Sequence, residues 1–429
     1  MSTNDARAAA GAARLRWLVL GLVFMAGALN YADRQIIALL KPVIEHDLGW
    51  SNSDYAGVLQ AFQLCNAAAL IPAGWLIDRL GVRAGYALGV GTWSLAAMAH
   101  GLATTLAQFT GARALLGITE ATNAPAALKS VAAWFPLEER SAAMGFINTA
   151  PNIGNVVAPL VVPALALAFG WRPAFVIVGA AGAVWITLWL ALGRVAPLPP
   201  TLGPAAAETA AAPAALTGRA WLAMLADRRT WAVAGAKFLS DQSWWFLLFW
   251  APDFFHRKFG LTLGGVGGPL ALTYLLAAGG AFLGGLAATA LLRRGVRIGV
   301  ARKAMLAIAF LIVSPIAAAQ LAPDAWSAAL ILGVALAGHQ AFSTNIFAMS
   351  ADIFPPAVMG SAVGVASTTG TLGGMGILAL AGWSLDHGHG YGPMFLSCTL
   401  GYPAAIAWIH LMLPVIRPWS PDAAEAPGT

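Results

Sequence analysis

The chain has 429 residues, of which 59% are hydrophobic and only 10% are charged. A soluble domain carries about 25% charged residues, so this composition excludes an ordinary soluble protein and predicts a polytopic membrane protein. The net charge of +6 does not indicate nucleic-acid binding, because most basic residues lie in short segments between hydrophobic stretches. Cys65 and Cys398 both lie in apolar stretches and predict no disulfide framework.

A membrane-spanning helix needs about 20 predominantly apolar residues. Twelve segments meet this requirement, at residues 16–40, 54–77, 84–105, 107–133, 141–166, 172–193, 229–255, 266–291, 300–320, 325–350, 358–384 and 392–415. The first has no clear small-residue cleavage site and predicts a retained span rather than a signal peptide. The predicted fold class is therefore an all-α polytopic membrane protein with twelve transmembrane helices.

The basic residues of the loops are distributed unevenly between the two sides of the membrane. With both termini on one side, seventeen Lys and Arg residues fall on that side, and four, Lys41, Arg172, Arg257 and Lys258, fall on the other. Because positive residues accumulate in cytoplasmic loops, both termini are predicted to be cytoplasmic.

A Pro- and Ala-rich stretch at residues 196–216 predicts a flexible cytoplasmic linker between two halves. The predicted organisation is an N-terminal six-helix bundle at 1–194, a linker at 195–228 and a C-terminal six-helix bundle at 229–429.

Two short motifs recur between these halves at nearly the same offset. Arg79-Leu-Gly-Val-Arg83 matches Arg293-Arg-Gly-Val-Arg297, and Phe135-Pro136 matches Phe354-Pro355. Repeats of this kind predict two pseudo-symmetric bundles around a central site.

Four charged residues lie inside otherwise apolar spans: Asp33 and Arg34 in the first, and Arg113 and Glu120 in the fourth. Ionised groups at membrane depth are costly and usually mark a substrate or proton path. Arg113 and Glu120 are seven residues apart, so they share one face of a helix. Fixed cations suit an anionic ligand and nearby carboxylates can titrate, which together predict a proton-coupled carrier of organic anions.

The loop after the second span reads Gly74-Trp-Leu-Ile-Asp78-Arg79-Leu-Gly81-Val-Arg83. It resembles the G-x-x-x-D-R-x-G-x-R signature of the major facilitator superfamily; the alternative is an ordinary charged turn. Gly74 is expected to allow tight helix contact and Gly81 a tight turn. Asp78, with Arg79 and Arg83, is expected to form cytoplasmic gating contacts with a neighbouring helix end or arginine.

A narrower resemblance involves Asn30-Tyr31-Ala-Asp33-Arg34 together with Arg113 and Glu120. These residues resemble the anion:cation symporter family, which includes bacterial hexuronate and aldonate carriers and animal sialic-acid and vesicular glutamate carriers. The blocks at 237–250 and 343–355 resemble the hexuronate (glucuronate and galacturonate) branch. The resemblance covers nearly all of residues 16–415 and implies a location in the bacterial cytoplasmic (inner) membrane.

The resemblance implies that Arg34 and Arg113 bind the substrate carboxylate and that Asp33 and Glu120 form the protonatable pair. Bidentate guanidinium–carboxylate bonds are geometrically selective, which suits a uronate. The alternatives are a structural arginine, with Arg34 paired to Asp33 or Glu120, and carboxylates that act as permanent counter-ions.

Further substrate contacts are expected from Tyr31, Asn66, Asn148, Asn152, Trp244, Trp245, His339, Asn345 and Thr369. A glutamine that related aldonate carriers have in span five falls on or near Pro151 here. Asn148, Asn152 and Asn155 are spaced to share a helix face and could replace it. One of the adjacent Trp residues is expected to stack on a sugar ring, whereas His339 could instead be a satisfied structural histidine.

Lys237 and Asp241 are one turn apart in span seven and predict an internal ion pair that stiffens or gates the helix, or else a ligand contact. The sequence has no cluster with metal-ligand spacing, no Ser/His/Asp set and no phosphate loop, which argues against a membrane enzyme and a cofactor other than the proton.

The predicted function is proton-coupled import of a hexuronate by a monomeric carrier through alternating access. An aldonate, a glucarate-like diacid or an aromatic carboxylate is the alternative substrate. A non-transporting sensor of such anions is a more remote alternative, and efflux of cationic drugs is disfavoured by the two arginines.

Overall fold

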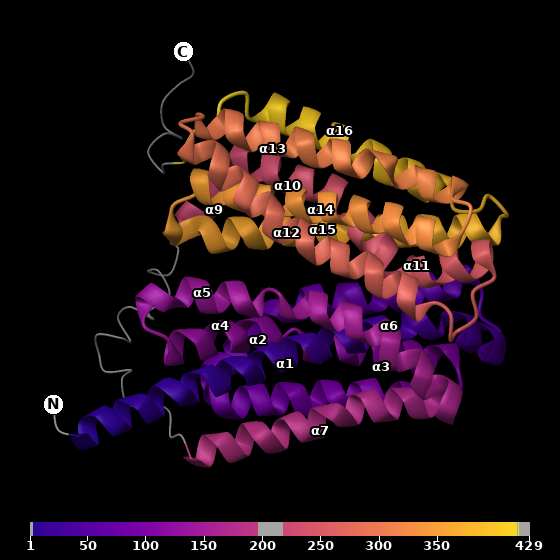
Figure 1. Ribbon diagram of the computed structural model, residues 1–429, viewed down its shortest axis with the longest axis horizontal. Coiled ribbons are helices and arrows are strands. Elements are labelled where there is room, and N and C mark those ends of the chain that lie inside the picture. The colour runs from indigo at the N-terminus through magenta and orange to yellow at the C-terminus, as the bar shows by residue number, and fades with distance from the viewer. Residues whose placement is uncertain (1–2, 196–217, 418, 420–429) are drawn as a thin grey trace. The chain divides into compact units, whose positions relative to one another are not determined.

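The computed structural model describes residues 3–195, 218–417 and 419, and within these ranges every regular element is a helix (Figure 1). The predicted flexible linker at 196–216 lies outside the described residues. The first seven helices are α1 (Thr3–Leu48), α2 (Asn52–Ala99), α3 (Leu106–Glu120), α4 (Asn123–Trp134), α5 (Leu137–Ile147), α6 (Ala150–Phe169) and α7 (Trp171–Val195). A short 3₁₀ helix, η1 (His100–Leu102), follows α2.

The C-terminal half begins with α9 (Gly218–Ala226), which lies inside the segment predicted to be linker. It continues with α10 (Arg228–Ser240), α11 (Gln242–Phe259), α12 (Gly267–Arg293), α13 (Ile298–Val313), the 3₁₀ helix η2 (Ser314–Leu321), α14 (Ala325–Ile353), α15 (Pro356–Asp386) and α16 (Gly392–Met412).

Nine helical segments of the described chain are long and apolar enough to cross a membrane. One of them, Asn52–Leu102, contains two predicted spans, because Gly81 has a φ of 74° and interrupts α2. The predicted spans at 107–133 and 229–255 are each divided into two shorter helices. The chain is therefore a multi-pass membrane protein, and the predicted count of twelve spans is confirmed in part.

Three breaks in the helices lie beside polar residues. α3 ends at Glu120, α5 ends just before Asn148, and Asp241 separates α10 from α11. Irregular backbone at membrane depth is tolerated where its polar groups find partners or line a cavity. At the first break the Thr122 hydroxyl donates to the Thr119 carbonyl at 2.7 Å. Hydropathy along the sequence does not reveal such breaks, because the average over a window remains apolar.

The described helices form two compact units. The first comprises the described residues of Met1–Trp50, Gly57–Ala211 and Leu263–Gly267. Within it α1 packs against α6, α7 and α4. Two of the large aromatic side chains in its core have hydrogen-bonded polar atoms. The Tyr86 hydroxyl donates to Asn123 Oδ1 at 2.8 Å, and Trp185 Nε1 donates to the Leu22 carbonyl at 2.7 Å.

The second unit comprises the described residues of Ser51–Ala56, Ala212–Thr262 and Gly268–Thr429. Within it α10 packs against α15 and α16, and α13 packs against α14. Asp386, at the end of α15, accepts hydrogen bonds from the backbone nitrogens of Asn52 and Ser53 at 3.0 and 2.8 Å. These contacts satisfy amides in the first turn of α2, where a helix has no internal partners for them.

Gly117 allows α3 to approach α2 closely. A Cβ atom at this position would lie 2.5 Å from the Phe62 carbonyl oxygen and 3.2 Å from the Asn66 backbone nitrogen. The Asn66 amide also donates to the Gly117 carbonyl at 2.9 Å. Because Gly117 lies between Arg113 and Glu120 on α3, this close approach sets the position of both charged side chains relative to α2.

We expect Gly117→Ala to destabilise the protein by about 1–3 kcal/mol, the usual cost of inserting a methyl group into a packed contact. Gly111→Ala, on the exposed side of the same helix with nothing within 4 Å of its Cβ, is the matched control. Alanine favours a helix over glycine, so the control should be neutral or slightly stabilising. Thermal unfolding of both variants in detergent tests this, and equal melting temperatures would contradict the role of Gly117.

Candidate functional site

An ion pair joins α1 to α3 in the first unit. Arg34 Nε donates to Glu120 Oε2 at 2.6 Å, with the two side chains 11% and 0% exposed. Both residues lie in apolar helices, where a charged group needs a partner. Of the pairings considered for Arg34, the structure forms the one with Glu120.

Two further charged groups lie beside this pair. Arg113 is fully buried, and its Nη2 donates to the backbone carbonyl of Arg34 at 2.8 Å. Asp33 is 3% exposed and lies within electrostatic range of both Glu120 and Arg113. The seven-residue spacing of Arg113 and Glu120 thus brings both to α1, so the four charges of the first and fourth spans meet in one place.

Aromatic rings cover the two guanidinium groups. The Phe62 ring lies 4.7 Å from the Arg113 Cζ and 5.1 Å from the Arg34 Cζ, and the Tyr31 ring lies 4.9 Å from the Arg34 Cζ. Cation–π contacts are stronger when desolvated, and Phe62 is fully buried. Sequence reasoning missed Phe62, because an apolar residue in an apolar span gives no signal. Tyr31 was predicted as a substrate contact and is placed here against an arginine.

Two amides near these charges are buried without hydrogen-bond partners among the described residues. Gln35 and Asn155 are each 0% exposed, and neither the oxygen nor the nitrogen of either amide is paired. Gln35 follows Arg34 on α1, and Asn155 lies on α6, which packs against α1. Unsatisfied buried amides are costly and call for a ligand or water. Gln35 was missed, although a polar residue beside Asp33 and Arg34 in an apolar span was a usable signal.

The asparagines predicted from span five lie on both sides of a short helix break. Asn148 is exposed in the break after α5, whereas Asn152 and Asn155 are buried within α6. Their common face and their roles as ligands stay predictions. Asn66, from span two, donates a hydrogen bond from its amide nitrogen to the Gly117 carbonyl.

The second unit has its own buried polar cluster. Lys237 Nζ lies 2.8 Å from Asp241 Oδ1 and donates to Ser343 Oγ at 2.9 Å. His339 Nδ1 lies 2.9 Å from the Tyr402 hydroxyl, and the Trp244 ring stacks on the imidazole at 6.1 Å. The predicted Lys237–Asp241 ion pair is present. His339 has a partner for its Nδ1 within this unit, and its role as a ligand stays a prediction.

Three other residues predicted to contact substrate take part in helix packing. Asn345 donates to the Ala341 carbonyl at 2.9 Å. Thr369 Oγ1 lies 2.8 Å from the Ala234 carbonyl oxygen, and Trp245 stacks on Phe249 at 6.0 Å. Their roles as ligands stay predictions.

The charged motif after span two forms contacts within the first unit. Asp78 forms an ion pair with Lys129, and the Arg79 guanidinium lies over the Trp75 ring at 5.4 Å. The predicted tight turn at Gly81 is confirmed by its φ of 74°. The tight helix contact expected at Gly74 is absent, since a Cβ there would meet nothing within 4 Å among the described residues.

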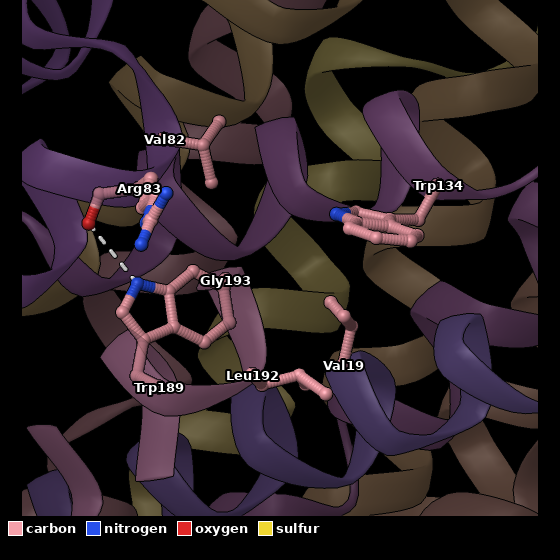
Figure 2. A pocket seen from close by; sticks show the side chains of 7 residues that line it. All are labelled: Val19, Val82, Arg83, Trp134, Trp189, Leu192 and Gly193. Carbon is pink, nitrogen blue, oxygen red and sulfur yellow. Dashed lines mark hydrogen bonds between the residues drawn. The ribbon is translucent and has the colours of Figure 1, made fainter. Parts of the chain in front are cut away.

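Arg83 lines a small pocket with Val82, Val19, Trp134, Trp189, Leu192 and Gly193 (Figure 2). Trp189 Nε1 donates to the Arg83 carbonyl at 3.0 Å, as Figure 2 shows. A Cβ at Gly193 would lie 2.5 Å from Arg83 Nε, so this glycine makes room for the arginine. The cavity of about 30 Å³ holds about one water molecule and is too small for a sugar acid.

Apolar helices around buried, partly paired charges are typical of a membrane transporter. Among the described residues no group of three or more His, Cys, Asp or Glu could hold a metal ion. Residues 23–377 match the family model of the Major Facilitator Superfamily. The chain belongs to this superfamily, which confirms the resemblance of its motif.

Curated relatives of the chain are sugar-acid transporters. It is 28% identical over 421 residues to the D-galactonate transporter of Escherichia coli O6:H1, covering 94% of this chain and 95% of the relative. It is 31% identical over 262 residues to the galacturonate transporter of Dickeya chrysanthemi, covering 58% and 74%. It is 27% identical over 394 residues to the hexuronate transporter of Escherichia coli K12, covering 89% and 90%.

A solved structure shares the fold. A bacterial homologue of the human lysosomal transporter Spinster matches with a TM-score of 0.69 at 20% identity, covering 93% of this chain and 96% of the other. At this identity the match supports the fold alone.

We expect Phe62→Leu to raise the KM for the transported anion at least about 5-fold, because two buried cation–π contacts would be lost and even an exposed contact of this kind contributes about 0.5–1 kcal/mol. Phe175→Leu is the control, since Phe175 is equally buried but stacks on His100 and other rings rather than on a cation. Uptake kinetics and thermal unfolding should be measured together. A loss of stability with an unchanged KM in Phe62→Leu would contradict a positioning role.

Proposed function

We propose that this protein imports a sugar-acid anion together with protons, and that the substrate is a hexuronate such as galacturonate or glucuronate. The observation that carries the proposal is the buried Arg34–Glu120 ion pair with Arg113 and Asp33 beside it. Two buried cations can bind a carboxylate, and two buried carboxylates can carry protons.

The proposed coupling is a competition for Arg34. A substrate carboxylate that binds the Arg34 guanidinium replaces Glu120 as its partner. An unpaired ionised carboxylate in an apolar helix costs several kcal/mol, so Glu120 then takes up a proton. Asp33 contributes to the same balance, because repulsion between two carboxylates in one buried site is relieved when one binds a proton. Substrate binding and proton binding thereby favour each other.

The proposed cycle is alternating access driven by the inward proton gradient. Each proton that enters gains about 2.3 kcal/mol per 100 mV of membrane potential, and a monovalent anion that enters with it loses the same amount, so one-to-one symport is driven by the pH gradient. We further propose that the protein is a monomeric carrier in the bacterial cytoplasmic membrane and that both of its termini lie on the cytoplasmic side.

The names of the relatives support a sugar acid, and the three relatives described above favour two candidates, beside the glucarate-like diacid that the sequence leaves open. The galacturonate and hexuronate transporters favour a cyclic uronate, as do the residues at 237–250 and 343–355. The galactonate transporter, which aligns over 94% of this chain, favours an open-chain aldonate as the second candidate.

We expect Arg34→Ala and Arg113→Ala each to abolish galacturonate or glucuronate uptake, because loss of one member of a buried charged contact costs about 3–5 kcal/mol. Lysine at either position should recover only part of the activity, since the planar guanidinium fork is lost. Arg294→Gln, an exposed arginine after α12, serves as a control for loss of charge. Substrate binding to the purified variants checks the result, and near-normal affinity in a folded Arg34→Ala or Arg113→Ala protein would refute the assignment.

Neutral variants of the two carboxylates should separate coupling from binding. A glutamine at position 120 keeps an oxygen that can accept the Arg34 hydrogen bond, so Glu120→Gln should bind substrate and exchange it across the membrane. Asp33→Asn should do the same. Neither should accumulate substrate under a pH gradient in proteoliposomes. If Glu120→Gln accumulates substrate like the parent, Glu120 is a structural counter-ion and Asp33 alone carries the proton.

Competition for uptake should distinguish the two substrate candidates. An indole can stack on the flat face of a pyranose ring, whereas an open-chain aldonate must be ordered on binding, a difference of about 1–3 kcal/mol. We therefore expect hexuronate to compete better than galactonate. Trp244→Leu should narrow the gap more than it reduces total carboxylate binding, with Trp245→Leu for comparison. If hexuronate and galactonate compete equally in the parent protein, the hexuronate assignment is refuted and the broader assignment, a sugar-acid symporter, is left.

A further inference from the structure

A groove runs between α13 and α16 on the second unit. Its volume is about 500 Å³, within the range of small-molecule sites. Its apolar wall is formed by Leu306, Ala307, Phe310, Pro403, Ile406 and Ala407. Both helices are apolar enough to span the membrane, and their outer residues, such as Leu311 and Leu411, are 66% and 74% exposed. The groove therefore lies on a surface with the composition of a lipid-facing one.

Two basic side chains, Lys303 and His410, lie at one end of this groove. Lys303 Nζ lies 3.3 Å from His410 Nδ1 and donates to the Pro414 carbonyl at 2.8 Å. Among the described residues no carboxylate lies within 4 Å of either side chain. A buried or half-buried cation in an apolar span normally has an acidic partner. Arg302, on the same helix as Lys303, has such a partner in Asp352 of α14, at 2.7 Å.

The position of the two basic groups matches the depth of lipid headgroups. Lys303 is five residues after the start of α13, and His410 is two residues before the end of α16. At 1.5 Å per residue, these groups are about 8 and 3 Å inside the ends of the two helices. The distribution of Lys and Arg predicts that this end is cytoplasmic, the side on which anionic lipids attract basic residues.

Two alanines and a proline determine the shape of the groove. Ala307 and Ala407 leave space on the facing sides of the two helices. Pro403, inside α16, lacks a backbone N–H and cannot donate to the carbonyl one turn earlier, which loosens the helix at this point. From Lys303 to Phe310 the wall extends about 10 Å along α13. The result is an apolar channel with a lysine and a histidine at its mouth.

We propose that the groove between α13 and α16 binds one anionic phospholipid of the cytoplasmic leaflet. Its phosphate group is held by Lys303 and His410, and part of an acyl chain lies against Phe310, Pro403 and Ile406. This site is separate from the charges around Arg34 and does not depend on the identity of the transported anion.

The test is native mass spectrometry of the purified full-length protein, titrated with phosphatidylglycerol and, separately, with phosphatidylcholine. The parent should bind phosphatidylglycerol about tenfold more tightly, on the scale of about 1 kcal/mol for each basic residue near an anionic lipid. The double variant Lys303→Gln/His410→Gln should lose this preference. Arg294→Gln, which removes a charge from an exposed site on the same predicted side, should keep it.

A second pair of variants tests the acyl-chain wall. Ala307→Phe fills the groove and should weaken phosphatidylglycerol binding, whereas Ala404→Phe, exposed on α16 outside the groove, should not. Glycerol phosphate, the soluble headgroup alone, should not bind at the same concentrations. Thermal unfolding confirms that each variant is folded. The proposal is overturned if the double variant retains the preference, if Arg294→Gln loses it equally, or if Ala307→Phe binds phosphatidylglycerol like the parent.

Discussion

The contact between Arg34 and Glu120 is the constraint around which the first unit is arranged. Charges inside apolar helices are tolerated only with partners, and here each partner comes from a different helix. Gly117 lets α3 approach α2, so the Phe62 ring can lie against both guanidinium groups. A buried ion pair adds little to stability compared with apolar residues of the same size. Its presence in these helices therefore supports the proposed role in binding and coupling.

Each unit combines a buried ion pair with a break in a membrane helix. Glu120 is the last residue of α3, and Asp241 separates α10 from α11 while pairing with Lys237. A helix break frees backbone groups and allows the two helix segments to move separately, which suits sites that must bind and release a ligand. The internal repeat is not strict, however. His339 follows Glu120 by 219 residues, the offset between Pro136 and Pro355, but it lies within the continuous helix α14 and contacts Tyr402.

The basic residues differ in the partners that their surroundings provide. Arg34 and Arg302 lie against other helices and find carboxylates, Glu120 and Asp352. Arg83 lies over Gly193 near a helix end and contacts the Leu190 carbonyl at 3.4 Å. Lys303, at a surface groove, has a carbonyl and a histidine as its partners among the residues that the structure describes. Charges deep in a bundle are matched by the protein itself, whereas charges at its lipid-facing ends can be matched by lipid headgroups.

The sequence by itself determined the membrane class, the family motif with its turn at Gly81, and the four charges of the first and fourth spans, because hydropathy, short motifs and helical spacing are local properties. It also predicted the Lys237–Asp241 pair from a spacing of one turn. Only the tertiary structure decided that Arg34 pairs with Glu120 rather than Asp33 and that Phe62 contacts two arginines. It also showed that Gln35 and Asn155 have no hydrogen-bond partner within the described part of the chain. It also separated Asn148 from Asn152 at a helix break. These features depend on which helices lie together and where they are interrupted, and neither is encoded in the periodicity of a single span.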